Sequence, residues 1–566
     1  METQWIYKPP VDEFRVQDLA GAINVNSHLA TLLLQRGVGS FEAAKNYFRP
    51  LLSQLPNPFG MTDMDLAVQR LVDAIGNGEK ILFYGDYDVD GTTSVALMVT
   101  FFREQYPNIG FYIPDRYAEG YGLSLAGVDH ARKNGFSLII TLDCGIKAHQ
   151  QISKAKEWGI DVMVCDHHRP EGTLPPALAI LNPQREDCDY PSKELSGCGV
   201  GFKLLQAFCQ HQGLDEQEAL FPLLDLVTLA IAADIVPIVN ENRILAYYGL
   251  KVLEKSPRPG IQALLKVAGV QAPFTISDLV FYVGPRINAA GRLAHAHEAV
   301  RLLLSNDAED AERRAHMLHE KNQERKQVDQ SITEEALAMI AEGGEAKSTV
   351  LFKEDWHKGI VGIVASRCIE QYYRPTIILT SSNQKATGSA RSVPGFDVYE
   401  ALHECEDLLE QFGGHTYAAG LTLALDKVDA FRSRFEQVVA KRIGPEGLVP
   451  QLEVDMEVPL EVLTPKFYAV LKQMAPFGPG NPEPILVSRN LKVLGQPRLL
   501  KEKHLKATIT DDNPQSGAIN IIGFNMAEFF PLLESGRPFS LAYALQENHW
   551  RGQTSLQLMA KDIRPE

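Results

Sequence analysis

Apolar and polar positions follow two different periodicities between residues 78 and about 240. Short apolar runs with the length of buried strands lie at 80–86, 109–113, 137–142 and 161–165. The stretches between them have the wider apolar spacing of helices, at 92–106, 122–134 and 146–158. Strands that alternate with helices predict a doubly wound parallel sheet. We expect one more strand from the apolar stretch Leu226–Ile238, which is interrupted by Asp234.

The pattern changes after residue 240. Residues from about 241 to 345 are helical in spacing, and charges of both signs alternate from Asn306 to Glu345 as in a solvated or bridging helix. Strand patterns at 349–352 and 375–380 indicate a second, mixed α/β domain. Five short strand patterns follow, near 485–495, 503–510, 517–524, 538–547 and 553–560. They predict an oligonucleotide-binding β-barrel, and we expect Phe524 and Tyr543 in its core.

These patterns divide the chain into five predicted segments, which agrees with a length of 566 residues that is too great for one hydrophobic core. The segments are a helical extension at 1–75, the parallel-sheet domain at 76–240, a helical connector with a long bridging helix at 241–345, a mixed α/β domain at 346–448 and the barrel at 449–566.

Three carboxylates stand at alternate positions directly after the first predicted strand. Asp86, Asp88 and Asp90 precede Gly91, and a helical pattern follows. Crowded carboxylates repel one another unless cations neutralise them, and hard oxygen ligands suit Mg²⁺ or Mn²⁺. A calcium-binding EF-hand loop is the alternative, but such a loop needs Glu at its twelfth position, where this chain has Leu97.

Polar groups follow the later apolar runs as well. Asp143 ends the third predicted strand, the triplet Asp166-His167-His168 ends the fourth, and Asp234 interrupts the last apolar stretch. Ligands of open α/β sheets lie outside the carboxyl ends of the strands, so we expect these groups to converge. Each one alone is compatible with an ordinary turn or helix cap. Six carboxylate or imidazole groups together are enough for a centre of two cations.

The net charge of −16 opposes a broad nucleic-acid-binding surface, because such surfaces are usually basic. The basic residues near the predicted centre are few and predict a narrow internal track: Arg116, Lys147, Lys203, Arg286, Arg292 and Arg391. The densest basic run of the barrel consists of Arg498, Lys501, Lys503, His504 and Lys506.

Cysteine usage and the N-terminal residues predict a cytoplasmic location. The seven cysteines are scattered without metal-binding spacing, as is typical of reduced thiols. The N-terminal residues lack a basic segment followed by an apolar one, so no secretory signal is expected. The most apolar long stretch, at 219–239, is too interrupted by charge and proline to span a membrane.

The order of the motifs resembles the DHH phosphoesterase superfamily. The resemblance covers residues 80 to about 420 and is carried by eight segments: Gly85–Gly91, Asp143–Gly145, Asp166–His168, Ser196–Lys203, Asp234, Gly284–Leu293, Gly388–Ser392 and Phe412–His415. The run Gly197–Gly201 is not a dinucleotide-binding loop, because Phe202 follows it and the acidic partner is absent. We expect close backbone packing or phosphate contact there.

The resemblance implies a DHH catalytic domain, a DHH-associated substrate-binding domain and an oligonucleotide-binding barrel. It implies an exonuclease with two Mn²⁺ or Mg²⁺ ions that degrades single-stranded DNA from 5′ to 3′ and releases 5′-mononucleotides in DNA repair and recombination. It also implies a monomer, with single-strand binding protein and a helicase as protein partners. Two alternatives stay open: a phosphodiesterase for short oligonucleotides or cyclic dinucleotides, and an inactive replication scaffold.

The ligand sets also follow from the resemblance. One cation would be held by Asp86, Asp88 and Asp143, and the other by Asp90, Asp143, His167 and Asp234, so that Asp143 bridges the two. Some relatives carry His where this chain has Tyr84, which leaves the geometry of the first cation open.

Further side chains are expected around the cations. Asp166 would orient a ligating imidazole, and His168 would contact the phosphate or the leaving oxygen unless it is only a hydrogen-bonded support. Arg286 and Asn288 are expected to reach phosphates or to hold the metal loop. The predicted substrate contacts are Arg116, Arg292, Ser389, Arg391, Gly413, Gly414 and His415, of which Arg116, Ser389 and Arg391 would form a 5′-phosphate pocket.

Overall fold

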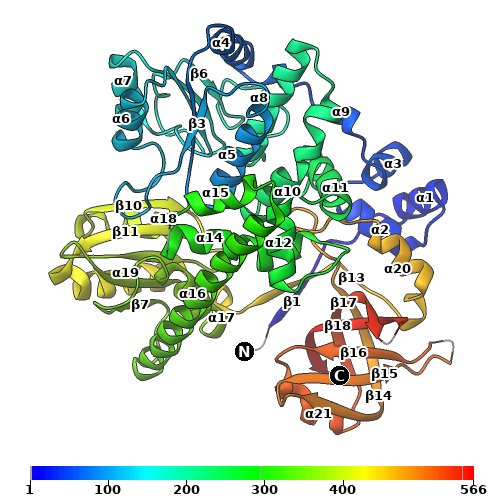
Figure 1. Ribbon diagram of the computed structural model, residues 1–566. Coiled ribbons are helices and arrows are strands. Elements are labelled where there is room, and N and C mark those ends of the chain that lie inside the picture. The colour runs from blue at the N-terminus through cyan, green and yellow to red at the C-terminus, as the bar shows by residue number, and fades with distance from the viewer. Residues whose placement is uncertain (1–2, 294, 515, 551) are drawn as a thin grey trace. The chain divides into compact units, whose positions relative to one another are not determined.

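The computed structural model describes residues 3–293, 295–514, 516–550 and 552–566 (Figure 1). Contacts group these residues into two units. The first unit consists of residues 57–236 and 249–450, and the second of residues 3–56, 237–248 and 451–566.

A five-stranded parallel sheet in the order β3-β2-β4-β5-β6 lies at the centre of the first domain, which confirms the predicted sheet. Its strands are β2 (Ile81–Gly85), β3 (Ile109–Tyr112), β4 (Leu138–Leu142), β5 (Asp161–Cys165) and β6 (Ala179–Leu181). One face is covered by α6 (Leu125–Lys133) and α7 (His149–Glu157), which share an apolar core with β2 and β4. The other helices of this domain are η2 (Pro58–Gly60), α4 (Met64–Gly76), α5 (Val89–Phe102) and α8 (Gly197–Gln212), of which α5 packs on β2 and α8 on β4 (Figure 1).

The stretch Leu226–Ile238 is not a strand, so that prediction was wrong. It forms α10 (Leu224–Ala233), and Asp234 is the C-cap residue of this helix. A fully buried helix is apolar on all sides and therefore lacks the periodicity that separates a helix from a buried strand. Every residue of α10 except Ala233 is buried between its neighbours, which include α5 and α8.

The connector is helical, as the sequence predicts. Its elements are α11 (Asn240–Lys255), α12 (Pro259–Ala268), α13 (Ile276–Asp278), η4 (Leu279–Val283), α14 (Gly284–Leu293), α15 (His297–Leu304) and the 35-residue α16 (Ala308–Glu342). The short helices α9 (Glu216–Ala219) and η3 (Phe221–Leu223) precede the connector, between α8 and α10. The long helix packs against α12, α14 and α15. Among the described residues, no helix is both long and apolar enough to cross a membrane.

The second α/β domain contains a sheet in the order β10-β11-β9-β8-β7, in which only β7 and β8 are parallel neighbours. Its strands are β7 (Thr349–Phe352), β8 (Thr376–Ser382), β9 (Lys385–Arg391), β10 (Gln411–His415) and β11 (Ala418–Ala424). Its helices are α17 (Val361–Gln371), α18 (Val398–His403), η5 (Glu406–Leu408), η6 (Leu425–Lys427), α19 (Val428–Arg442) and η7 (Pro445–Leu448). Residues of α17 pack with α16, so the long helix joins this domain to the connector.

The second unit contains the predicted barrel. Its closed ring consists of β14 (Leu486–Leu500), β15 (His504–Thr510), β16 (Ile519–Gly523), β18 (Gln553–Pro565) and β17 (Phe539–Trp550), and β14 also pairs with β17. Tyr543 is buried in the core as expected and hydrogen-bonds Ser488. Phe524 is 55% exposed, so its predicted core position was wrong. Phe524 follows the end of β16, where an outward side chain faces solvent.

The N-terminal helices share an apolar core with the barrel. They are α1 (Glu13–Ile23), α2 (Ser27–Gln35) and α3 (Phe41–Phe48), flanked by β1 (Gln4–Tyr7) and η1 (Leu52–Gln54). The remaining elements of this unit are β12 (Gln451–Val454), β13 (Met456–Glu457), η8 (Leu460–Val462), α20 (Pro465–Lys472), η9 (Ala527–Phe529) and α21 (Phe530–Glu534). α4 instead packs on α8 and β6 of the sheet domain, so the contacts divide the N-terminal 75 residues between the two units.

Candidate active site

The three carboxylates that follow β2 are held by backbone N–H groups. Asp86 is buried, and its Oδ1 accepts a hydrogen bond from the backbone of Gly122 at 3.2 Å. Asp88 caps α5 by accepting from the backbone of Gly91 at 3.1 Å. Since α5 begins here, the capping residue and the ligands of the predicted cation belong to the same turn.

The glycine-rich start of α8 holds the third carboxylate. The backbone N–H groups of Gly197 and Cys198 donate to Asp90 at 2.6 and 2.8 Å. A Cβ at Gly197 would lie 2.5 Å from Cβ of Asp143, so only glycine permits this approach. Of the two roles expected for this run, the structure therefore shows close backbone packing.

His167 lies among three carboxylates that come from different elements. Its Nε2 is 3.2 Å from Asp143, 3.6 Å from Asp234 and 3.8 Å from Asp90. Asp143 follows β4 with φ 61°, a left-handed conformation that is uncommon for residues other than glycine. A strained backbone at a strand end is frequent in functional sites, where the surrounding contacts enforce it.

The carboxylates are strongly coupled to one another. Burial, and then the negative charge of Asp88, raise the pKa of Asp90 to about 7 and that of Asp86 well above its usual value. Burial, and then Asp90, likewise raise the pKa of Asp143 and of Asp234. The pKa of His167 is lowered to about 4 by burial and by His168, so its imidazole is neutral at pH 7. Neutral imidazole is the form that binds metals.

The donor set fits two hard divalent cations. Within the described residues, the buried atoms Oδ2 of Asp86 and Nε2 of His167 make no hydrogen bond. A buried polar atom without a partner is costly, and bound cations would satisfy both atoms and offset the repulsion between the carboxylates. The structure thus brings together all six predicted ligands: Asp86, Asp88, Asp90, Asp143, His167 and Asp234.

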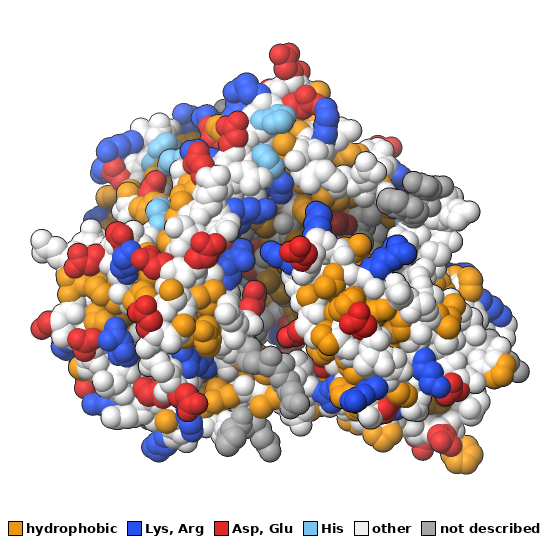
Figure 2. Space-filling model, turned by 90° about the horizontal axis from the view of Figure 1, so that it is seen from below, with side chains coloured by type: hydrophobic (Ala, Val, Ile, Leu, Met, Phe, Trp, Pro, Cys, Tyr) orange, Lys and Arg blue, Asp and Glu red, His pale blue; other side chains and the backbone are white. Residues whose placement is uncertain are grey.

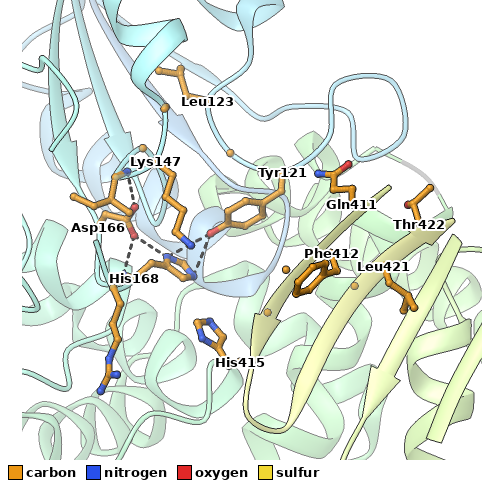
Figure 3. Close-up of a pocket in the computed structure, with 18 of the residues that line it drawn as sticks. Tyr121, Leu123, Lys147, Asp166, His168, Gln411, Phe412, His415, Leu421 and Thr422 are labelled. Atoms are coloured by element: carbon orange, nitrogen blue, oxygen red, sulfur yellow. Dashed lines mark hydrogen bonds and ion pairs between the residues drawn. The ribbon is translucent and has the colours of Figure 1, made fainter. Parts of the chain in front are cut away.

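Asp166 orients His168 and not His167. Its Oδ1 lies 2.7 Å from Nδ1 of His168, and the carboxylate also accepts from the backbone of Ile146 at 3.0 Å. The hydroxyl of Tyr121 lies 3.2 Å from Nε2 of His168 and 3.2 Å from the backbone oxygen of Asp143 (Figure 3). Burial alone would lower the pKa of His168, but the hydrogen bond to Asp166 raises it to about 9.

A cavity of about 780 Å³ lies between the sheet domain and the second α/β domain. Figure 3 shows His168 and Tyr121 on one side of it, and Gln411, Phe412 and Leu421 on the strands opposite. The predicted substrate residues Gly413, Gly414 and His415 also line it. A Cβ on Gly413 would meet no atom within 4 Å, so the missing side chain leaves open space next to the cavity.

Four arginines gather next to the acidic cluster. Burial, and then the positive charges of Arg116, Arg325 and Arg391, lower the pKa of Arg292 to about 10. Arg116 stacks over the ring of Tyr87 at 4.7 Å. Within the described residues, Arg116, Arg292 and Arg391 form no ion pair. Positive groups crowded together without acidic partners are typical of an anion site.

Ser389 and Arg391 are joined within this group. Nη1 of Arg391 donates to Oγ of Ser389 at 2.6 Å. A Cβ on Gly362, in the first turn of α17, would lie 2.9 Å from Nη2 of Arg391 and 3.1 Å from Oγ of Ser389. The start of a helix, a guanidinium and a hydroxyl therefore face the same small space, as in anion sites of other proteins.

Two further predicted residues lie on α14. Arg286 donates to the backbone oxygen of Tyr282 at 2.5 Å and to Nδ1 of His319 at 3.2 Å, which links α14 to η4 and α16. Asn288 is half-buried and lies one helical turn before Arg292 on α14. Their predicted catalytic roles stay predictions.

Three residues near the site were not predicted from the sequence: Tyr121, Arg325 and Gly362. Tyr121 is flanked by Gly120 and Gly122, both with positive φ, and this pair of glycines was the available signal for a special loop. Arg325 is hidden in the charge-rich pattern of α16, and only the packing of this helix shows that it faces inward. On the face shown in Figure 2, acidic and basic side chains are interspersed, so that face presents no broad basic surface.

Three family models match the chain. They are the DHH family N-terminal domain over residues 80–231, the DHHA1 domain over residues 345–441 and the RecJ OB domain over residues 454–562.

Known proteins are similar over nearly the whole chain. The single-stranded-DNA-specific exonuclease RecJ of Bacillus subtilis is 37% identical over 565 residues, which are 99% of this chain and 70% of that protein. The protein of the same description from Escherichia coli is 37% identical over 560 residues, which are 95% of this chain and 96% of that protein. The crystal structure of RecJ in complex with Mn²⁺ from Thermus thermophilus superposes with a TM-score of 0.84 at 28% identity, over 100% of this chain and 80% of that chain.

Proposed function

The chain belongs to the RecJ family of single-stranded-DNA-specific exonucleases, and from this premise we propose how it recognises and cleaves its substrate. It is a metal-dependent hydrolase that removes nucleotides from an end of single-stranded DNA. We propose that it proceeds from 5′ to 3′, releases 5′-mononucleotides and acts in DNA repair and recombination. The convergence of the six predicted ligands next to a cluster of arginines carries this proposal.

Mn²⁺ or Mg²⁺ is the cofactor that the donor set supports. We propose two ions, one held by Asp86, Asp88 and Asp143, and the other by Asp90, Asp143, His167 and Asp234. Bound there, the ions would activate a water molecule and neutralise the charge of the scissile phosphate.

The protein's own groups position the phosphodiester. His168 is held by Asp166 and Tyr121 at the wall of the cavity, and the raised pKa of about 9 keeps it protonated at neutral pH. A protonated imidazole at this place can donate to a phosphate oxygen or to the leaving oxygen. We therefore propose that Asp166 orients the ring of His168 and stabilises its protonated form.

The 5′ polarity is proposed to arise from the anion site. Arg116 comes from the loop after β3, whereas Ser389 and Arg391 come from β9, so a terminal phosphate would be bound from both domains of the first unit. A terminal phosphate carries more charge than an internal diester and matches the geometry of guanidinium groups. Arg292 and Arg325 would add to the positive charge of this site.

The two alternatives are less well supported. A phosphodiesterase for short or cyclic substrates has no use for the barrel, which matches the RecJ OB domain. An inactive scaffold would not need the assembled ligand set with its unsatisfied Asp86 and His167 atoms. Single-strand binding protein and a helicase as partners, a monomeric state and a cytoplasmic location are further proposals that rest on the sequence.

A time course on end-labelled substrates tests the proposal. Single strands and duplexes labelled at the 5′ or the 3′ end, together with dinucleotides, would be incubated with the protein and Mn²⁺ or Mg²⁺. We expect immediate release of mononucleotide from the 5′ label of single strands, slow loss of the 3′ label, and intact duplexes. Release from the 3′ end first would refute the proposed polarity. Preferential cleavage of dinucleotides would favour the phosphodiesterase for short substrates.

A further inference from the structure

The helical connector carries two exposed aromatic side chains that the function proposed above does not use. η4 is a π-helix of five residues in which Leu279 and Val283 are buried. Phe281 in the same turn is 69% exposed, and Tyr282 is 46% exposed. Short π-helices occur frequently at functional sites, and neighbouring exposed aromatic rings mark a binding surface.

The backbone that carries these rings lies near the acidic cluster. η4 continues directly into α14, and a Cβ on Gly284 at the start of α14 would lie 3.6 Å from Cβ of Ala233 and 3.9 Å from Cγ2 of Val89. Ala233 immediately precedes Asp234, and Val89 stands between Asp88 and Asp90. The backbone that carries Phe281 and Tyr282 is therefore packed on residues adjacent to three predicted metal ligands.

Ile235 adds apolar area near the same place. It follows Asp234 with φ 59°, a left-handed conformation that β-branched residues avoid, and its side chain is 60% exposed. α10, which ends at this point, packs against η4. Strain and exposure in a side chain next to a metal ligand are better explained by a ligand that covers it than by stability of the fold.

Positive charge accompanies the aromatic rings. Arg286 is buried behind the rings, where it donates to the backbone oxygen of Tyr282 and to Nδ1 of His319, and it forms no ion pair within the part of the chain that the structure describes. Lys326 is exposed. Burial, and then the positive charges of Arg286 and Arg325, lower the pKa of Lys326. Aromatic faces next to cations that lack acidic partners suit one ligand class, namely single-stranded nucleic acid, in which bases stack and phosphates are paired with cations.

We propose that Phe281 and Tyr282 form a stacking platform for the bases of the strand beyond the scissile phosphate, with the exposed Lys326 facing its backbone. This inference rests on the proposed function. It means that the strand reaches the active site along the helical connector. Every base has an aromatic face, so the platform holds the strand without regard to sequence and allows it to advance after each cleavage. A dinucleotide has only one base beyond the scissile phosphate, so it gains less from the platform than a long strand does.

Substrate length provides the test. Phe281→Ala, Phe281→Trp and the control Phe14→Ala would be compared with the unmodified protein on a 20-nucleotide strand and on a dinucleotide. Phe14 is a suitable control because it is 87% exposed and belongs to α1. We expect Phe281→Ala to lower kcat/KM on the long strand about tenfold more than on the dinucleotide, mainly through KM. Phe281→Trp should restore the long-strand value, because it replaces one ring with a larger one.

A binding measurement separates stacking from a structural effect. Asp143→Ala protein, with and without Phe281→Ala, would be titrated with strands that carry 2-aminopurine at successive positions, and quenching at one position should be lost with Phe281. Equal losses on both substrate lengths, or quenching that does not depend on Phe281, would overturn the platform. If the unmodified protein failed to degrade single strands at all, the proposed function itself would be wrong, which is a different result.

Discussion

Nδ1 of His168 lies 2.7 Å from Oδ1 of Asp166, while Nε2 of the same ring lies 3.2 Å from the hydroxyl of Tyr121. The same hydroxyl lies 3.4 Å from Nδ1, so the ring is contacted by two residues from different loops, Asp166 and Tyr121. The Tyr121 hydroxyl also lies 3.2 Å from the backbone oxygen of Asp143, so the support of His168 is tied to the predicted bridging ligand. This arrangement fixes the direction in which the imidazole faces the cavity.

Tyr121→Phe should therefore lower kcat and leave KM nearly unchanged. The substitution removes one hydrogen bond and keeps the ring, and a bond of this kind contributes about 1 kcal/mol, or a factor of about five in kcat. Asp166→Asn should cost more, because it removes the charge that stabilises protonated His168. Steady-state kinetics on a single strand would measure both. Tyr373→Phe, outside the residues that line the cavity, is the control, and a change in KM alone would argue against a positioning role.

Asp143→Asn should abolish hydrolysis and leave strand binding within about tenfold. Asparagine tolerates the left-handed backbone at this position, φ 61°, so the substitution removes a charge without a new backbone strain. Binding would be measured by fluorescence anisotropy with a labelled strand, and hydrolysis by release of nucleotide. Retention of more than a few per cent of the activity would contradict the assignment of Asp143 as the ligand shared by two ions.

Removal of divalent metal should lower the melting temperature of the protein. Cations that bind only the folded state stabilise it, by about 2.7 kcal/mol at a metal concentration one hundred times the Kd. Differential scanning fluorimetry with Mn²⁺ or with EDTA would measure the shift, which we expect to be several degrees. Asp143→Ala should reduce the shift strongly. An equal shift in both proteins would mean that the metal acts elsewhere.

The parallel sheet could be predicted because β2, β4 and β5 are buried apolar runs with a polar group at the end, whereas the three-residue β6 was not predicted. Asp86, Asp143 and Asp166 were found in this way, since the carboxyl ends of parallel strands share one edge. Asp234 was correctly predicted to join the acidic cluster, but it follows the helix α10 and not a strand. A fully buried helix and a buried strand are equally apolar, and the sequence offers no periodicity to separate them.

Other residues could not be predicted, because their position depends on contacts between distant segments. Tyr121 reaches His168 only because the loop after β3 returns to the ends of β4 and β5. Arg325 faces the other arginines because α16 packs on α14, and nothing in its local sequence distinguishes it from solvated neighbours. The exposure of Phe281 depends on the π-helical turn, whose wider geometry has no sequence signature.

Loss of two basic residues from the barrel should weaken the salt dependence of strand binding. Arg498 and Lys506 are paired across β14 and β15, on strands that also carry His504 beside the exposed ring of Phe524. Each phosphate contact contributes about 0.7 to the slope of log K against log salt for single strands. Arg498→Ala with Lys506→Ala should reduce the slope by about 1.4 on this basis. Arg537→Ala, exposed in the same domain, is the control, and an unchanged slope would exclude this face.

Arg391→Ala should reduce activity on 5′-phosphorylated strands much more than on 5′-hydroxyl strands. Its guanidinium is bonded to Ser389, faces the start of α17 and lies near Arg292 without an acidic partner among the described residues. Charge-assisted contacts of this type contribute roughly 1.5–3 kcal/mol, which corresponds to a preference of tenfold or more. Competition between the two substrates in one reaction would measure the ratio directly. Arg434→Ala, whose half-exposed side chain pairs with the exposed Asp407, should leave the ratio unchanged. If Arg391→Ala lowered both rates by the same factor, the arginine would serve the scissile phosphate or the fold, and the 5′ end would have to be recognised elsewhere.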